Sequence, residues 1–212
     1  MRTIKILLTF GPASVPIDEV RRITNHSTGA LGATLADYFR SQNHELIALR
    51  GEGATVPFAF PYLSFNTNHD LQKKLEEIST QTQPDLILHA AALCDYEIDR
   101  IQTEKSPNLA SPSKISSHHP HLTLHLKPAP KILPQLRPWF PKSTIISWKY
   151  ELEGTPAEAI AKAQKQVQLK YSDYSIINGK AYGPGFGICN TTAVIYPHLD
   201  SQTLAQKILT LI

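Results

Sequence analysis

The chain has 212 residues, of which 42% are hydrophobic and 18% are charged, and its formal net charge is +3 at pH 7. This length and composition predict a globular protein with a sizeable core, and they exclude the collagen-like, coiled-coil and disordered classes. The mildly basic balance is compatible with anionic small-molecule ligands. It lacks the clustered Lys and Arg stripe of a nucleic-acid-binding protein, so we expect no nucleic-acid partner.

Cysteine usage and hydropathy indicate the compartment. Cys94 and Cys189 form neither a C-x-x-C pair nor a metal-spaced set, which is typical of a reduced cytoplasmic protein. The apolar stretch after Lys5 is shorter than the roughly 7–15 residues of a signal-peptide core. Because no segment approaches the ~18 apolar residues of a membrane span, we expect a cytoplasmic protein without a membrane segment.

The first half of the chain predicts the opening of a Rossmann-like sheet. Residues 4–10 form an apolar run that ends at Gly11-Pro12, which predicts a buried strand. Residues 11–28 are polar and predict a long loop, a helix is expected at 29–42, and a second strand at 45–50. Thr67 or Asn68 is expected to cap a helix with apolar positions 71, 75 and 78. Residues 85–91 predict a central strand.

The second half adds further strands and two helices. Residues 107–117 lack periodicity, and we expect a mobile loop at about 99–117. Residues 121–127 alternate and predict a half-buried strand, and further strands are expected at 144–148, 174–178 and 192–196. Thr155, Pro156 and Glu158 form a capping-box pattern that predicts a helix to about 170, and another helix is expected at 201–212. The predicted fold is a three-layer α/β Rossmann-like mixed sheet, mostly parallel with an antiparallel C-terminal strand, in one domain over residues 1–212.

Ordered sequence blocks resemble a known enzyme family across almost the whole chain. The longest covers residues 9–32, and shorter blocks are A-A-A-L-C-D-Y at 90–96, K-I-S-S at 114–117, I-S-W-K-Y-E at 146–151, I-I-N at 176–178 and G-F-G at 185–187. Together they resemble phosphopantothenate–cysteine ligase (phosphopantothenoylcysteine synthetase), the ligase half of the bifunctional coenzyme A biosynthesis flavoproteins. The resemblance implies an enzyme that joins 4′-phosphopantothenate to L-cysteine through an acyl-nucleotide intermediate.

The start of the predicted first helix is a candidate phosphate site. Backbone N–H groups that lack intrahelical partners and the positive end of the helix dipole attract anions there. An isolated S-T-G sequence is equally typical of an ordinary helix cap. The resemblance implies that the substrate-binding residues are Gly11, Ser27, Gly29 and Gly32.

The resemblance also implies catalytic and nucleotide-binding residues. Asn25 can both donate to and accept from an acyl group. Lys114 and Arg21 are the cations expected to stabilise charge at the α-phosphorus, although Arg21 beside Arg22 is also typical of a solvated surface pair. A carboxylate such as that of Asp95 can hold a ribose hydroxyl or a metal, and it can equally be a turn residue. The expected nucleotide-binding residues are Ala91, Ala92, Asp95, Trp148, Lys170 and Asn178.

The expected co-substrates are a nucleoside triphosphate and Mg²⁺, and the family is usually a homodimer. The choice between ATP and CTP stays open, because the I-S-W-K-Y-E block and the Ser116-Ser117 pair lean toward the ATP-using eukaryotic type whereas bacterial members mostly use CTP. Pro12-Ala13 replaces the Gly-Thr of the family's first turn, which removes a hydroxyl near the expected phosphates.

Alternative interpretations of single features are weaker. His118, His119, His121 and His125 lack acidic or Cys companions at ligand spacing, so no metal site is predicted. Cys94 fits a small buried thiol better than a nucleophile, because the sequence places no His partner beside it. An NAD(P)-dependent or sugar-nucleotide oxidoreductase would need a G-x-G-x-x-G turn, and the flavin-dependent decarboxylase fused to this ligase would need a P-x-M-N element; the only Met is Met1. A non-catalytic nucleotide-binding homologue remains as an alternative.

Overall fold

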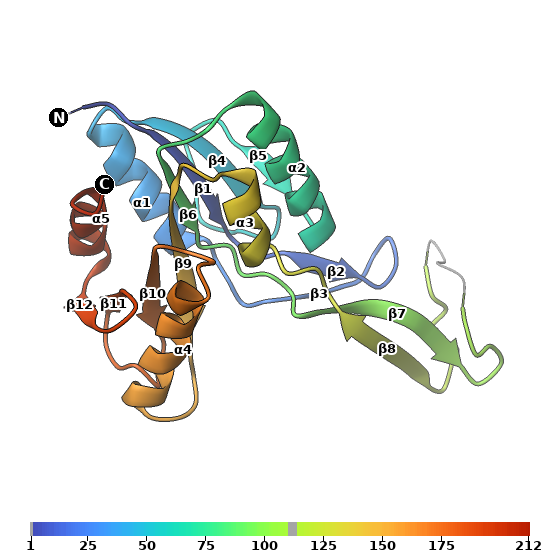
Figure 1. Cartoon of the computed structure of the whole chain (residues 1–212). Coiled ribbons are helices and arrows are strands. Elements are labelled where there is room, and N and C mark those ends of the chain that lie inside the picture. The colour runs from blue at the N-terminus through green and yellow to red at the C-terminus, as the bar shows by residue number, and fades with distance from the viewer. Residues whose placement is uncertain (1, 110–113) are drawn as a thin grey trace.

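A computed structural model describes residues 2–109 and 114–212, and its centre is an eight-stranded sheet (Figure 1). Strands β10, β9, β6, β1, β4 and β5 run parallel to one another, and β11 is antiparallel to both β10 and β12. The predicted mixed α/β sheet is therefore confirmed. From edge to edge the strands are β12 (Val194–Leu199), β11 (Phe186–Cys189), β10 (Tyr174–Asn178), β9 (Thr144–Tyr150), β6 (Leu86–His89), β1 (Lys5–Phe10), β4 (Glu45–Gly51) and β5 (Leu63–Phe65).

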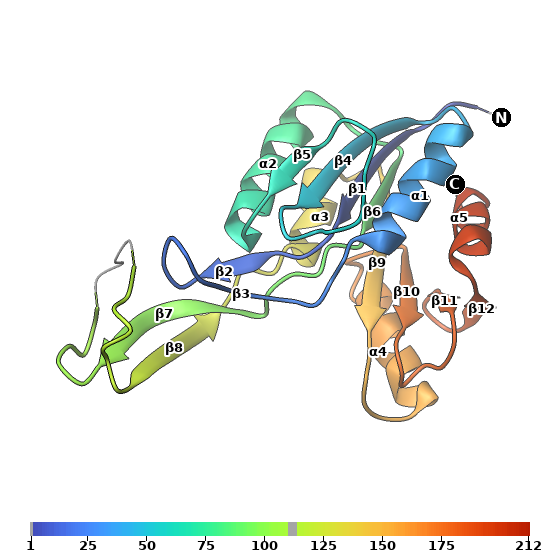
Figure 2. The ribbon, with the colours of Figure 1, turned by 180° about the vertical axis from the view of Figure 1, so that it is seen from behind.

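Helices cover both faces of the sheet and make the predicted three layers (Figures 1 and 2). Helices α1 (Ala30–Ser41) and α5 (Ser201–Leu209) pack on one face, and α2 (Asn68–Gln81), α3 (Leu133–Trp139) and α4 (Pro156–Gln168) pack on the other. Strand β1 is central, so its side chains are buried on both sides: Ile6 and Leu8 pack toward α1 and α5, and Leu7 packs toward α2. The predicted capping box of α4 is formed by Thr155 and Glu158.

Two antiparallel hairpins lie outside the main sheet and project from it side by side (Figures 1 and 2). The first pairs β2 (Ser14–Pro16) with β3 (Arg22–Thr24), in a segment expected to be a polar loop. The second, which we call the arm, pairs β7 (Tyr96–Thr103) with β8 (Leu122–Pro128). The expected mobile loop at 99–117 is thus wrong for residues 99–103, which are hydrogen-bonded strand; residues 110–113 of that prediction lie outside the described residues.

Strand β8 differs from the half-buried strand that its alternation predicts. Within residues 2–109 and 114–212 it pairs only with β7, and Leu122 and Leu126 of its apolar face are 39% and 49% exposed. The alternation of apolar and polar residues indicates that one face of the strand is apolar, but it does not indicate what packs against that face.

Candidate functional site

Two loops meet at the carboxyl ends of β1 and β6, where parallel α/β sheets bind ligands. Pro12 and Ala92 form a parallel bridge, with hydrogen bonds of 2.9 Å from Ala92 N to Gly11 O and 3.0 Å from Ala13 N to Ala92 O. Gly11 has a φ of 80°, and a Cβ there would lie 2.9 Å from that of Ala54. Gly11 is therefore required by the backbone turn itself, which accounts for the glycine without a ligand.

Asn25 joins this junction from the chain segment before α1. Its side-chain Nδ2 donates hydrogen bonds of 3.1 Å to Ala92 O and 2.9 Å to Leu93 O. The side chain is exposed, and the structure thus brings Asn25 to the predicted nucleotide-binding alanines. Because Nδ2 already has two acceptors, Oδ1 is the atom that a ligand can address.

The start of α1 lies at the same edge of the sheet. Gly29 is the N-cap residue, with a φ of 80° and no side-chain cap. The Thr28 hydroxyl accepts from Ala30 N at 3.3 Å, and Ser27 lies one residue earlier, half-buried. The ordinary cap, in which the N-cap residue is itself Ser or Thr, is therefore not the arrangement found, and the N–H groups after Ala30 in the first turn keep their capacity to bind an anion.

Gly32, one of the predicted substrate-binding residues, faces strand β1. A Cβ at Gly32 would lie 2.3 Å from Cβ and Cγ of Phe10, and Phe10 is 1% exposed. The glycine therefore lets α1 pack closely on β1, and this packing explains the residue without a ligand.

The loop after β6 is held by a residue that the sequence marked only as a possible cap. Thr67 is the N-cap of α2, and Asn68 instead binds the backbone of Cys94, with Nδ2 donating to Cys94 O at 2.8 Å and Oδ1 accepting from Cys94 N at 3.2 Å. Asn68 is 4% exposed.

Asp95, the residue after Cys94, has an exposed carboxylate that pairs with Lys131. Burial, with Asp95 adding to it, raises the pKa of the Cys94 thiol, which fits an inert thiol and not a nucleophile.

Trp148 and Asn178 lie on neighbouring strands β9 and β10 and point to the face covered by α1 and α5. Ile176 pairs with Trp148 in register, and Asn178 is two residues beyond Ile176, so all three share that face. Trp148 Nε1 and Asn178 Oδ1 are buried and have no hydrogen-bond partner in the part of the chain that the structure describes. A buried donor and a buried acceptor without partners are features that a polar ligand can satisfy.

A charged cluster that sequence reasoning missed closes the end of β9. Glu151 is 9% exposed, and its carboxylate pairs with Lys149 at 2.9 Å and Lys162 at 2.5 Å. Burial raises the pKa of Glu151, but the two ammonium groups outweigh it and hold that pKa below its ordinary value. The spacing of Lys149 and Glu151 on a strand was a visible signal, since residues two apart on a strand share a face.

Lys170 lies far from the other predicted nucleotide-binding residues of the same chain. It follows the C-terminus of α4 with a φ of 59° and precedes β10, so it lies at the amino ends of the strands. Asn178 ends the same five-residue strand. A strand of that length spans about 16 Å, which separates Lys170 from the carboxyl edge.

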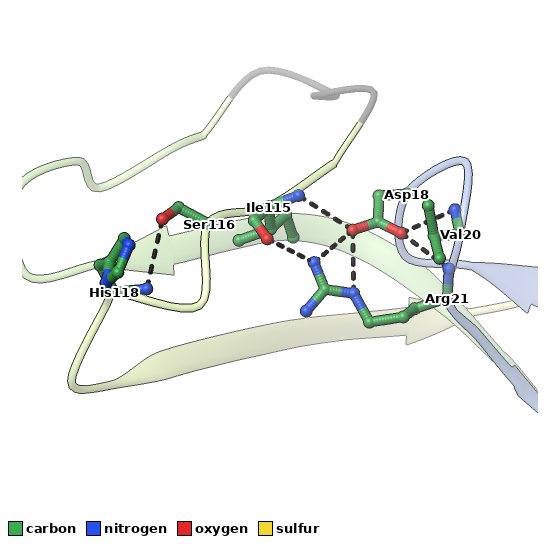
Figure 3. Close-up of polar contacts among 6 residues, drawn as sticks. All are labelled: Asp18, Val20, Arg21, Ile115, Ser116 and His118. Carbon is green, nitrogen blue, oxygen red and sulfur yellow. Dashed lines mark hydrogen bonds and ion pairs between the residues drawn. The ribbon is translucent and has the colours of Figure 1, made fainter.

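Arg21 and Lys114, predicted independently, are brought together. Arg21 Nη2, in the turn between β2 and β3, donates a hydrogen bond of 2.7 Å to the carbonyl of Ile115, the residue after Lys114 (Figure 3). Lys114 itself is exposed. Both residues therefore lie where the β2–β3 hairpin contacts the segment that connects β7 to β8.

His119, His125 and His89 each have a different hydrogen-bond partner. His119 pairs with Glu104 at 3.1 Å and His125 with Gln102 at 2.9 Å. His89, at the end of β6, is 7% exposed and shares a 2.8 Å hydrogen bond with the Thr9 hydroxyl. Over residues 2–109 and 114–212, no group of three or more His, Cys, Asp or Glu side chains is placed to hold a metal ion.

A mostly parallel sheet with a helix start and two meeting loops at its carboxyl edge defines a Rossmann-like α/β protein with a candidate ligand site at that edge. The chain belongs to the family described as DFP, the DNA/pantothenate metabolism flavoprotein C-terminal domain, which matches residues 1–208. The family expected from the sequence blocks is thereby confirmed.

Named relatives agree with this assignment. The chain is 27% identical over 180 residues to the coenzyme A biosynthesis bifunctional protein CoaBC of Thermococcus kodakarensis, covering 84% of this chain and 42% of the relative. It is 27% identical to CoaBC of Methanocaldococcus jannaschii, covering 82% of this chain and 40% of the relative. It thus spans about two fifths of these proteins. The structure of a DNA/pantothenate metabolism flavoprotein from Streptococcus pneumoniae matches with a TM-score of 0.85 at 25% identity, over 99% of this chain and 98% of that one.

No helix within the described ranges is both long and apolar enough to cross a membrane.

Proposed function

We propose that this chain is a phosphopantothenate–cysteine ligase of coenzyme A biosynthesis. The carboxylate of 4′-phosphopantothenate attacks the α-phosphorus of a nucleoside triphosphate, and pyrophosphate leaves. The amine of L-cysteine then attacks the acyl carbon of the acyl-nucleotide, and the nucleoside monophosphate leaves with the formation of the amide. Membership of the family and the CoaBC relatives support this chemistry.

The observation that carries the proposal is the convergence of three features at one edge of the sheet. These are the uncapped start of α1, the Gly11–Ala92 junction and the exposed amide of Asn25. In our proposal the phosphate of 4′-phosphopantothenate lies at the start of α1 near Ser27 and Gly29. Asn25 Oδ1 and the backbone around Ala92 orient the acyl group beside the nucleotide.

The nucleotide is proposed to lie along the carboxyl ends of β6, β9 and β10. Ala91 and Ala92 offer little side-chain bulk, so a nucleotide can approach the backbone there. The unpartnered Trp148 Nε1 and Asn178 Oδ1 are a donor and an acceptor suited to a base. Asp95 is an exposed carboxylate near this edge, and it must leave Lys131 to hold a ribose hydroxyl or a metal.

The magnesium ion is proposed to arrive bound to the nucleotide as part of the substrate. Mg²⁺ in phosphoryl-transfer sites is held mainly by phosphates and water, with one or two carboxylates. Arg21 and Lys114 are proposed to stabilise the charge that accumulates during attack on the α-phosphorus.

We also propose that the chain works as a homodimer in the cytoplasm. Apolar side chains are exposed on both projecting hairpins, including Val20 at 66% and Tyr96 at 57%, in addition to Leu122 and Leu126 of the arm. Exposed apolar patches of this kind are typical of protein interfaces, and a second copy would cover them. Both cysteines are free thiols, which supports a reducing compartment.

The test is a reconstituted reaction with 4′-phosphopantothenate, Mg²⁺ and either ATP or CTP. Without L-cysteine, we expect acyl-nucleotide and pyrophosphate; with it, phosphopantothenoylcysteine. Nucleotide binding without pyrophosphate release from either nucleotide would contradict the ligase and favour the non-catalytic homologue, in which the Pro12-Ala13 turn has removed a phosphate contact. Lys105→Gln is a suitable control for charge variants, because Lys105 is another exposed lysine of the segment between β7 and β8.

A further inference from the structure

The two oxygens of Asp18 serve two different parts of the chain (Figure 3). Oδ1 accepts from Val20 N at 2.9 Å and Arg21 N at 2.7 Å, which closes the turn between β2 and β3. Oδ2 accepts from Arg21 Nε at 3.0 Å, Arg21 Nη2 at 2.5 Å and Ile115 N at 3.0 Å. One oxygen therefore makes a local turn, and the other reaches a residue 97 positions away.

Ile115 is fixed from both sides of its peptide backbone. Its N–H donates to Asp18 Oδ2, and its carbonyl accepts from Arg21 Nη2 at 2.7 Å. Its side chain is buried, with 2% exposed. The backbone groups of the residue that directly follows Lys114 are thus held by an aspartate–arginine pair on another hairpin.

The Asp18 carboxylate is suited to stable hydrogen bonds with Arg21 and Ile115. Its side chain is fully buried against these donors, whereas that of Arg21 is 42% exposed. The Arg21 guanidinium, followed by the Ile115 N–H, lowers the pKa of Asp18 far below its ordinary value, so the carboxylate stays ionised throughout the physiological range. Hydrogen bonds to an ionised acceptor are about twice as strong as neutral ones, which favours a well-ordered contact.

We propose that Asp18 is a positioning residue that holds Ile115 against Arg21 and thereby orders the exposed Lys114 for its role at the α-phosphorus. This inference rests on the proposed function. A turn-forming role alone does not explain the structure, because Oδ1 accepts both backbone N–H groups of the turn and Oδ2 also accepts from Ile115 N on another segment. Ordering a charged group before the reaction lowers the entropy that the transition state must lose.

Asp18→Asn separates the two roles. An asparagine keeps one oxygen for Val20 N and Arg21 N, and asparagine is itself a good turn former. It places an NH₂ group where Oδ2 was, opposite an N–H and a guanidinium that can only donate. The turn is expected to persist while the contact with Ile115 is lost. Glu19→Gln is the matched control, because Glu19 is the exposed neighbouring acid outside these hydrogen bonds.

The first readout is trypsin cleavage after Lys114, which needs no assumption about activity. Loss of the charged hydrogen bonds should speed cleavage of the Lys114–Ile115 bond by about 10–10²-fold, since cleavage follows the population of the opened segment. Glu19→Gln should cleave at the wild-type rate, and Lys114→Gln should remove the fragment and so confirm its identity. Wild-type cleavage of Asp18→Asn would overturn the inference.

The second readout is the rate of acyl-nucleotide formation without cysteine. Asp18→Asn should lower kcat by about 10–10²-fold and change the KM for nucleotide much less, because a misplaced catalytic group costs transition-state and not ground-state binding. If Asp18 acts through Lys114, the double variant Asp18→Asn/Lys114→Gln should be no slower than Lys114→Gln alone.

The outcomes distinguish the two proposals. An Asp18→Asn protein with fast cleavage but an undiminished rate overturns the positioning role, and so does a double variant that is slower by the product of the two single effects. A wild-type protein without ligase activity overturns the proposed function and with it the catalytic purpose of Asp18, while the cleavage comparison still decides whether Asp18 orders the segment.

Discussion

His89 is the side chain through which we expect pH to act most directly on stability. It ends β6 directly before the Ala90–Ala92 segment, and burial lowers its pKa from an ordinary value of 6.5 to about 4. The folded protein thus keeps His89 neutral at pH 7. In the unfolded chain the same imidazole binds a proton below pH 6.5, so acid favours the unfolded state.

The magnitude follows from the two pKa values. Above pH 6.5 both states carry a neutral imidazole, and the stability is complete. As the pH falls from 7 to 5, the free energy of unfolding should decrease by about 2 kcal/mol through this group, and by about 3 kcal/mol on reaching pH 4. Below about pH 4 the folded protein also binds the proton, so this contribution to the slope ends.

The assay compares urea unfolding of wild type and His89→Gln at pH 7, 6 and 5. The variant should be less stable at pH 7, because it disturbs a buried site and the hydrogen bond with Thr9. The stability difference between the two proteins should then shrink toward pH 5. His121→Gln changes an exposed histidine and is the control. A difference that stays constant from pH 7 to pH 5 would refute the assignment of a buried neutral imidazole.

Three further substitutions test the site. Lys114→Gln should reduce the rate of acyl-nucleotide formation by about 10²–10³-fold with little loss of nucleotide affinity. The rate is measured as pyrophosphate release, with Lys105→Gln as the control. An unchanged rate would show that Lys114 is a solvated residue without a catalytic role. Asn25→Asp should lower turnover strongly and stability by only about 1 kcal/mol, because a carboxylate oxygen would face two carbonyls at an exposed position; full activity would remove Asn25 from the site. Gly32→Ala should lower the free energy of unfolding by about 3 kcal/mol in thermal or urea unfolding, since its Cβ overlaps Phe10, and an unaltered Tm would contradict the close packing of α1 on β1.

The sequence predicted the elements whose local pattern matches their final surroundings. Residues 4–10 are mostly apolar because β1 is covered on both faces, and Thr155 with Glu158 caps α4 through contacts within one turn. Short strands such as β5 and β11 and the short helix α3 were missed, because three to seven residues carry too little periodicity. Of the arm, the strand at 121–127 was predicted and is found as β8, whereas β7 was missed because its pairing depends on a partner strand distant in the sequence.

The candidate site was predictable in composition but not in arrangement. Asn25 and Ala92 were named separately, and only the fold shows that their atoms are hydrogen-bonded. Asn68 and Asp18 were overlooked as site residues because asparagine and aspartate before helices and in turns have ordinary local explanations. Lys170 precedes β10 as the sequence order indicates, and its predicted contact with a nucleotide stays a prediction.

Strands β6 and β9 are neighbours in the sheet, although residues 90–143 separate them along the chain. Most of that separation is the excursion into the arm. The entropy cost of closing a flexible loop rises with the logarithm of its length, by about 0.6 kcal/mol for each doubling. The free energy of pairing β6 with β9 is therefore nearly insensitive to how much chain the excursion contains. Insertions and deletions in the arm away from the Ile115 contact can change its length while the central sheet stays the same.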